Sequence, residues 1–170
     1  MVCSFPPIIG AGARVLVLGS MPGVRSLEAS RYYAHPQNRF WPFMGELLGA
    51  GFELPYPHRC RRLVEAGVAV WDVLASCERE GSLDSAIRDE TARPNDFAAL
   101  FDAYPRIGMV LFNGGKAEAS FRRLVRPSLA RDGLIYRRLP STSPANASQR
   151  VDAKLAAWRD ALREAGVTSA

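Results

Sequence analysis

Residues 14–23 read RVLVLGSMPG, and this stretch decides the fold. A β-branched, apolar run that ends in glycine is typical of a buried strand, and Gly-Ser-Met-Pro-Gly is typical of the turn that leaves it. In open α/β sheets, ligands bind beyond the carboxyl ends of the strands. We therefore expect residues 19–23 at the ligand-binding edge of such a sheet.

Strands and helices alternate along the rest of the chain, and the alternation predicts a mainly parallel sheet with helices on both faces. The expected fold is α/β: a single-domain, three-layer α/β/α sandwich over residues 1–170, with a central, mainly parallel, four-stranded sheet. The turn-rich region Gly81–Pro94 is expected to be a longer excursion. Apolar periodicity predicts strands at Arg14–Gly19, Val68–Leu74, Ile107–Asn113 and Leu134–Leu139, and helices at Phe40–Leu48, Arg59–Ala66, Asp96–Ala103, Lys116–Val125 and Ala147–Glu164.

Composition indicates a soluble protein. With 170 residues and 48% hydrophobic content, the chain can bury an adequate core. No apolar segment approaches the length of a membrane span, and the N-terminus lacks a signal-peptide pattern, so we expect no membrane association. The 3 cysteines are scattered and odd in number, which favours free thiols in a cytoplasmic protein. They lack metal-site spacing, so no structural metal is expected.

The net charge of +5 moderately favours a polyanionic partner. A more specific signal is the decapeptide at 32–41, which reads YYAHPQNRFW and comes shortly after the first strand. Aromatic faces stack on bases, an amide offers both a donor and an acceptor, and arginine holds phosphate. The decapeptide therefore points to a nucleobase, free or within nucleic acid.

Two further segments fall at predicted strand ends. LFNGG at 111–115 places Asn113 after a buried run, beside glycines that allow a ligand to approach the backbone. LPSTSPAN at 139–146 is a hydroxyl-rich loop before the last helix, where backbone amides and serine hydroxyls suit phosphate. Each signal is weak alone, because such loops are often plain turns. Three together at one sheet edge are moderately specific.

With these segments, the chain resembles the uracil-DNA glycosylase superfamily, and most closely its hypoxanthine-DNA (deoxyinosine) glycosylase branch. The resemblance is carried by GSMPG at 19–23, YYAHPQNRFW at 32–41, FNGGKA at 112–117 and LPSTSPAN at 139–146. It implies a monofunctional enzyme that flips a damaged base out of DNA and hydrolyses its N-glycosidic bond without a cofactor. The implied partner is DNA containing a damaged base, bound by a monomer.

Two departures from the superfamily pattern affect the chemistry. Met21 stands where many relatives carry Asp or Asn, and Leu139 stands where uracil-specific members carry a histidine. The usual groups that position water and assist the leaving base are therefore missing. In the branch that this chain resembles, the asparagine of the HPxN segment, here Asn38, takes over catalysis. Uracil preference is in doubt for the same reason.

Candidate roles follow from the resemblance and from residue chemistry. The Asn38 amide oxygen can hold water against C1′, and His35 could donate a proton to a purine ring nitrogen. His35 could equally be a loop histidine that bonds the backbone. We expect the base to be bound by Ser20, Met21, Tyr33, Phe40 and Asn113.

Among these, Tyr33 corresponds to the base-stacking aromatic of related enzymes, although a core tyrosine is the alternative. Phe40 opens a predicted helix, so a core position is its alternative. Arg39 could hold phosphate or be solvated. No role is derived for Asp72 or Asp84. Candidate DNA contacts are Arg39, Ser141, Thr142 and Ser143.

Other function classes stay open. Within the superfamily, the alternative is a uracil or mismatch-specific DNA glycosylase. A non-catalytic nucleic-acid-binding α/β module would need the aromatics and arginines, but not Asn38 in a closed pocket. An enzyme of free nucleotides would use the same sheet edge, but the sequence lacks a Gly-x-x-x-x-Gly-Lys phosphate loop.

Overall fold

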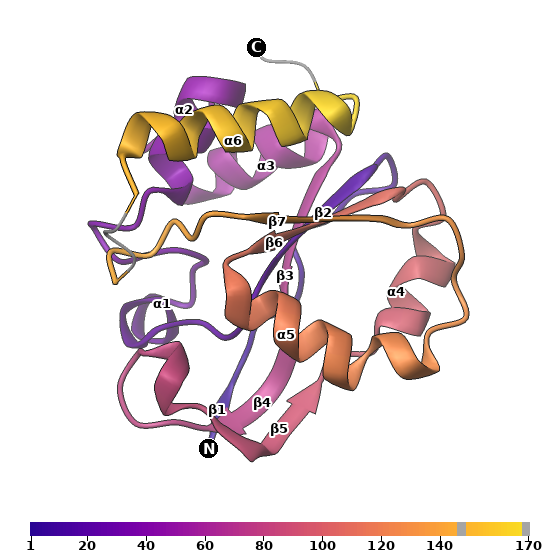
Figure 1. Ribbon diagram of the computed structural model, residues 1–170. Helices are drawn as coiled ribbons and strands as arrows, with labels where there is room; N and C mark the ends of the chain where they lie inside the picture. Colours follow the sequence, from indigo (N-terminus) through magenta and orange to yellow (C-terminus); the bar gives the residue numbers. More distant parts are fainter. Residues whose placement is uncertain (146–148, 168–170) are drawn as a thin grey trace.

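The computed structural model describes residues 1–145 and 149–167, and a parallel sheet of four strands lies at its centre (Figure 1). The strand order is β3-β2-β6-β7, and each neighbouring pair is parallel. The strands are β2 (Val15–Gly19), β3 (Val68–Asp72), β6 (Met109–Asn113) and β7 (Ile135–Leu139). The predicted α/β fold with a central parallel sheet is confirmed.

Helices cover both faces of this sheet, which explains why all five residues of β2 are buried. One apolar cluster includes Trp41, Leu63 and Trp158, which belong to helices α2 (Phe40–Leu48), α3 (Tyr56–Ala66) and α6 (Val151–Glu164). The opposite cluster includes Phe97 and Phe121 of α4 (Phe97–Ala103) and α5 (Gly115–Leu124). Since alternate strand residues point to opposite faces, Val15 and Val17 enter the first cluster while Leu16 and Leu18 enter the second.

Several predicted boundaries were wrong. Helix α3 begins at Tyr56, with a proline in its first turn, rather than at Arg59. Helix α6 begins at Val151 after the N-cap Arg150, whereas we predicted a start at Ala147, a residue outside the described ranges. The short helices α1 (Val24–Ala29) and η2 (Arg126–Ser128) were not predicted.

The strand predicted at Val68–Leu74 is in fact two strands in two sheets. After β3 ends, the backbone N–H groups of Val73 and Leu74 donate to the carbonyls of Gly19 and Ser20, at 2.8 and 3.2 Å. Strand β4 (Leu74–Glu78) then pairs antiparallel with β1 (Val2–Cys3) and with β5 (Arg88–Pro94). The apolar run resumes directly after Asp72, and this continuation hid the change of sheet.

The predicted excursion at Gly81–Pro94 therefore contains strand β5 and the single turn η1 (Asp84–Ala86). Ile87 and Ala92 pack into the apolar cluster shared with α4 and α5. This anchoring holds the loop that precedes Ile87, residues 82–84, at the carboxyl end of the parallel sheet.

The last residues of the four parallel strands form one row across that sheet. Gly19 pairs with Asp72 and Asn113 pairs with Leu139, while the pairing of Leu18 with Phe112 sets Gly19 beside Asn113. We call Asp72, Gly19, Asn113 and Leu139 the floor row. Since it follows Val17, Val70 and Leu111 by two positions along its strands, the floor row faces the side of α2, α3 and α6.

Candidate active site

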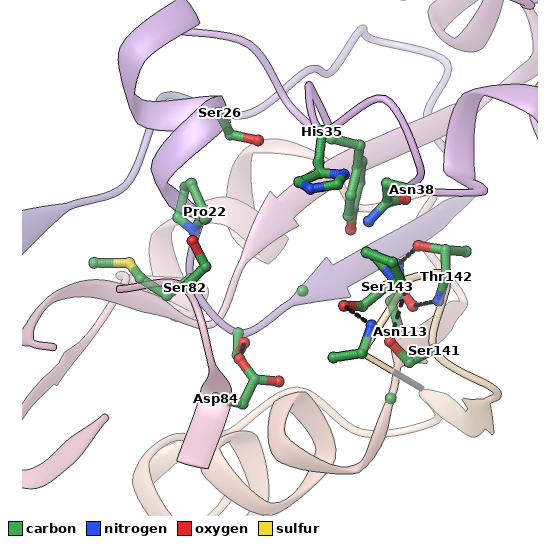
Figure 2. Close-up of a pocket in the computed structure, with 18 of the residues that line it drawn as sticks. Pro22, Ser26, His35, Asn38, Ser82, Asp84, Asn113, Ser141, Thr142 and Ser143 are labelled. Carbon is green, nitrogen blue, oxygen red and sulfur yellow. Dashed lines mark hydrogen bonds between the residues drawn. The ribbon is translucent and has the colours of Figure 1, made fainter. Parts of the chain in front are cut away.

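A cavity of about 930 Å³ opens at the carboxyl ends of the parallel strands, and all four residues of the floor row line it. Its walls come from segments that are far apart in the sequence (Figure 2). Ligand pockets of small molecules typically measure about 300–1,000 Å³, so a flipped nucleotide fits this space. The cavity lies at the edge predicted from residues 14–23, and its walls are built by residues 19–26, 32–38, 82–84, 113–115 and 138–145.

Tyr33 supplies the aromatic wall. One face of its ring stacks on Phe40, with centroids 4.2 Å apart and an interplanar angle of 26°. The backbone of Tyr33 is in the left-handed region, with φ of 54°, which is uncommon for a residue with a bulky side chain. Such conformations cost free energy and cluster at functional sites, so this backbone is consistent with a binding role for Tyr33.

The base contact predicted for Phe40 is wrong in this conformation. Its side chain has 0% exposed surface and is absent from the cavity lining. It packs edge-on against Trp41 and Trp158, at centroid distances of 5.0 and 6.1 Å. Phe40 therefore supports the Tyr33 ring from behind, because the helix that it opens turns its side chain into the core.

Asn38 and His35 both line the cavity, on the side opposite Ser82 and Asp84 (Figure 2). The Asn38 side-chain oxygen accepts the backbone N–H of Phe40 at 2.9 Å, which fixes the amide at the start of α2. Its amide hydrogens and a second oxygen lone pair stay available for other partners. His35 Nδ1 accepts the backbone N–H of Gln37 at 3.1 Å. A neutral His35 therefore carries its proton on Nε2.

Asn113 is engaged by Thr142 through both ends of its amide. Its nitrogen donates to the Thr142 hydroxyl, and its oxygen accepts the Thr142 backbone N–H, each at 2.9 Å. Thr142 lines the cavity but is only 1% exposed, and its hydroxyl is engaged by Asn113, so its predicted DNA contact stays a prediction. Its carbonyl also accepts the backbone N–H of Arg39 at 2.9 Å. Thr142 thus joins the end of β6, the loop after β7 and the start of α2.

Ser141 and Ser143 border the cavity from the loop that Thr142 anchors. Each hydroxyl oxygen accepts a backbone N–H two residues ahead, from Ser143 and Ala145, at 3.1 and 3.2 Å. The hydroxyl protons can therefore donate to a ligand. From α6, Lys154 donates to the Ser141 carbonyl at 3.0 Å, and burial and then the charge of Arg39 lower the pKa of Lys154.

Exposed cations surround the cavity mouth. Arg39 follows Asn38 directly, whereas Arg25 and Arg138 line the opening. The Arg138 guanidinium lies over Gly115, where an added Cβ would be 2.8 Å from Nη2. The sequence analysis did not single out Arg25 and Arg138, because the sequence does not reveal which arginines lie together at the cavity mouth.

The loop at 82–84 was given no role from the sequence, yet it forms a wall of the cavity. The Ser20 hydroxyl donates to an Asp84 carboxylate oxygen at 2.5 Å, and the Val24 backbone N–H donates to the Ser82 hydroxyl at 2.8 Å. Buried Arg79 reinforces the wall by donating to the carbonyls of Gly81 and Pro22, at 2.8 and 2.6 Å. These contacts join loop 82–84 to the turn after β2.

Asp72 was also missed, and it is a buried carboxyl group of the cavity, at 4% exposure. Burial raises the pKa of its carboxyl to about 7, with the negative charge of Asp84 adding to the shift and Arg79 opposing it. A signal was present in the sequence, because Asp72 ends an apolar strand in the same way as Asn113 does.

The arrangement suits the binding and hydrolysis of a base-bearing nucleotide. Tyr33 offers a ring face, the floor row offers hydrogen-bonding groups at the inner end, and Asn38 and His35 stand at the wall. Met21 and Leu139 are buried at 7% and 6% exposure and contribute only apolar surface. Ser20 is held by Asp84, which leaves its oxygen to accept hydrogen bonds.

Comparisons with known proteins agree with this description. The family model for the Uracil DNA glycosylase superfamily matches residues 6–164. A protein named hypoxanthine DNA glycosylase from Methanosarcina barkeri is 34% identical over 160 residues, which cover 94% of this chain and 96% of that protein. One of the same name from Methanosarcina acetivorans is 34% identical over 143 residues, which cover 84% and 86% of the two chains.

A solved structure is also similar. It is the solution NMR structure of a candidate uracil DNA glycosylase from Methanosarcina acetivorans, with a TM-score of 0.78 and 31% sequence identity. The match covers 96% of this chain and 98% of that chain.

Proposed function

The chain belongs to the uracil DNA glycosylase superfamily, and from that membership we propose that it is a monofunctional DNA glycosylase that removes hypoxanthine from DNA. The enzyme flips the deaminated base into the cavity, hydrolyses the N-glycosidic bond and leaves an abasic site. The observation that carries this proposal is the pairing of the Tyr33 stacking face with Asn38 in one cavity at the strand ends. The two relatives named hypoxanthine DNA glycosylase support the choice of base.

Hydrolysis requires a positioned water and a stabilised leaving base. Loss of a base proceeds through a positively charged sugar, so the water needs little prior deprotonation and orientation matters more than basicity. Asn38 performs that orientation, with its amide held by the N–H of Phe40. His35 Nε2 is placed to donate to the base. Tyr33, supported by Phe40, stacks on the flipped base.

A purine such as hypoxanthine suits this cavity better than uracil, because its larger ring system gains more stacking area on Tyr33. Met21 and Leu139 contribute apolar surface rather than polar groups that would select uracil. Asn113 holds Thr142 with one amide hydrogen and one oxygen lone pair, so each end of its amide keeps capacity for a base edge.

A panel of damaged duplexes tests the proposal. Identical duplexes with one deoxyinosine, deoxyuridine or deoxyxanthosine are incubated with the protein, and abasic sites are scored as alkali-dependent breaks. We expect the fastest cleavage at deoxyinosine, because two relatives are named for hypoxanthine and because its purine offers more stacking area than uracil. Breaks without alkali would indicate a lyase instead, and no breaks on any of the three duplexes would refute the glycosylase function.

The DNA-binding role of the mouth leads to a separate prediction. Replacing Arg39 by Gln should weaken DNA binding and make the slope of log K against log[salt] shallower by about one, because one phosphate-bound cation is lost. Replacing Ser141 and Ser143 by Ala should weaken binding with little change of slope, since hydroxyls carry no charge. Fluorescence anisotropy over a range of salt concentrations measures both quantities.

A matched control is Arg106→Gln. Arg106 is exposed and precedes β6, so it lies at the opposite end of the parallel strands. The variant loses the same charge but should keep the wild-type affinity and slope. Equal effects of Arg39→Gln and Arg106→Gln would show that DNA does not bind at the cavity mouth.

A further inference from the structure

Asp72 supplies a carboxyl group at the inner end of the cavity. It belongs to the floor row, where it pairs with Gly19 across β2 and β3. Because Gly19 has no side chain, the Asp72 carboxyl extends over it: a Cβ at position 19 would lie 2.6 Å from Oδ1 of Asp72. The same Cβ would lie 3.2 Å from the Tyr33 hydroxyl. The two oxygens thus meet above the glycine, in the part of the cavity that the stacked base would reach.

The Asp72 carboxyl is not satisfied by the protein. Among the described residues, its buried Oδ2 has no hydrogen-bond partner, whereas the Tyr33 hydroxyl interacts with the Asn113 side chain. An unpartnered buried polar atom costs on the order of 1–3 kcal/mol, so it calls for an explanation. Asn95 binds the Asp72 backbone carbonyl at 2.8 Å and leaves the carboxyl untouched. The carboxyl is therefore available to a ligand.

Burial is the main reason that the neutral form of Asp72 is favoured near neutral pH, because it raises the pKa of the carboxyl. The negative charge of Asp84, from η1, adds to this shift, whereas the positive charge of Arg79, which follows β4, opposes it. From the segment before α2, Tyr32 and Tyr33 also face it, and the Asp72 charge in turn raises the pKa of both hydroxyls beyond what burial does. At pH values below its pKa of about 7, the carboxyl keeps its proton and can donate a hydrogen bond.

We propose that the protonated carboxyl of Asp72 is a further catalytic group, which donates a hydrogen bond to the flipped base and stabilises it as it leaves. This inference rests on the proposed glycosylase function. A carboxylic acid presents a donor and an acceptor side by side, which matches the O6 and N1–H of hypoxanthine. Uracil-specific members carry a histidine that assists the leaving base where this chain has Leu139. Asp72 takes over that role, and it lies at the opposite end of the floor row from Leu139.

The step is balanced in the following way. The bond from C1′ to N9 breaks, and its electron pair stays on the purine. The oxygen of water bonds to C1′, and that water releases one proton. Asp72 keeps its proton and donates a hydrogen bond with it to O6 of the purine, whose negative charge spreads over its ring nitrogens and O6, and the proton released by the water neutralises the purine anion. No other reactant is needed.

The test is the pH profile of single-turnover deoxyinosine excision by the full-length protein, for wild type, Asp72→Asn and Asp72→Ala, between pH 6 and 9. An amide keeps a donor and an acceptor but does not ionise. Asp72→Asn should therefore stay within roughly threefold of wild type at pH 6, and its rate relative to wild type should rise as the pH passes about 7. Asp72→Ala should lose about tenfold or more at pH 6.

Thermal unfolding of each variant checks that the cavity remains folded. A parallel pH dependence in wild type and Asp72→Asn, or a wild-type rate in Asp72→Ala, would overturn the role of Asp72. Failure of the glycosylase function looks different, since the wild type itself would then release no base at any pH. If Asp72→Ala proves unstable, Asp72→Asn alone still decides the question, because its relative rate against pH reports only the ionisation of Asp72.

Discussion

Replacing Asn38 by Ala is expected to lower the single-turnover rate of deoxyinosine excision by about a hundredfold or more, which is the typical cost of removing one preorganised polar group. The reason is that Met21 cannot orient water, so Asn38 is the amide left to do so at this wall of the cavity. DNA affinity should change little, because Arg39 and the loop at 141–143 remain. Rates on a deoxyinosine duplex and anisotropy on the same duplex measure the two effects.

The variant also removes a local hydrogen bond, and this effect must be separated from catalysis. The Asn38 oxygen accepts the N–H of Phe40, the first residue of α2, and loss of one such bond costs about 1 kcal/mol. Asn38→Asp is the matched control, since a carboxylate keeps this bond and can still orient water. It should retain more activity than Asn38→Ala at similar thermal stability. Full activity of Asn38→Ala would instead make His35 the next candidate.

Replacing Gly19 by Ala should lower excision by about a hundredfold, because displacement of reacting groups by about 1 Å can have that effect. The added methyl would lie 2.6 Å from Oδ1 of Asp72, which is too close for the structure to accept without movement. Asp72 and Tyr33 would both have to shift, and the base would lose its place at the floor row. Single-turnover kinetics and unfolding midpoints distinguish this local displacement from a loss of fold.

The control for this variant is Gly12→Ala. No heavy atom lies within 4 Å of a Cβ at position 12, so the same chemical change meets open space there. Its excision rate should equal that of wild type. A wild-type rate for Gly19→Ala would show that the base does not approach the floor row, and it would count against Asp72 as well.

The central sheet and the identity of its binding edge could be predicted from the sequence. The run Val15–Gly19 is apolar on both faces, and such a run is stable only between two layers of helices. The aromatic decapeptide and the segments around Asn113 and Ser141 follow strand ends, and parallel strands bring their carboxyl ends to one edge. Hydrophobic periodicity depends only on neighbouring residues, so it can be recognised in the sequence without knowledge of tertiary contacts.

The roles of individual residues depended on the tertiary structure. Phe40 and Tyr33 looked alike as aromatics, but the start of α2 turns one into the core and leaves the other at the cavity. Thr142 looked like a loop hydroxyl, but Asn113 holds it inside. In both cases, the direction of a side chain is set by the element that carries it and by a partner far away in the sequence.

Asp72 and Asp84 show the same limit most clearly. The two are separated by a change of sheet, which the apolar residues on either side of Asp72 conceal in the sequence. The packing of β4 and β5 beside the parallel sheet brings loop 82–84 back to the turn after β2. The sequence determined that a polar cavity would form at the end of β2. Which carboxylates enter it was decided by the tertiary structure, because burial and charge proximity arise only from residues that meet after folding.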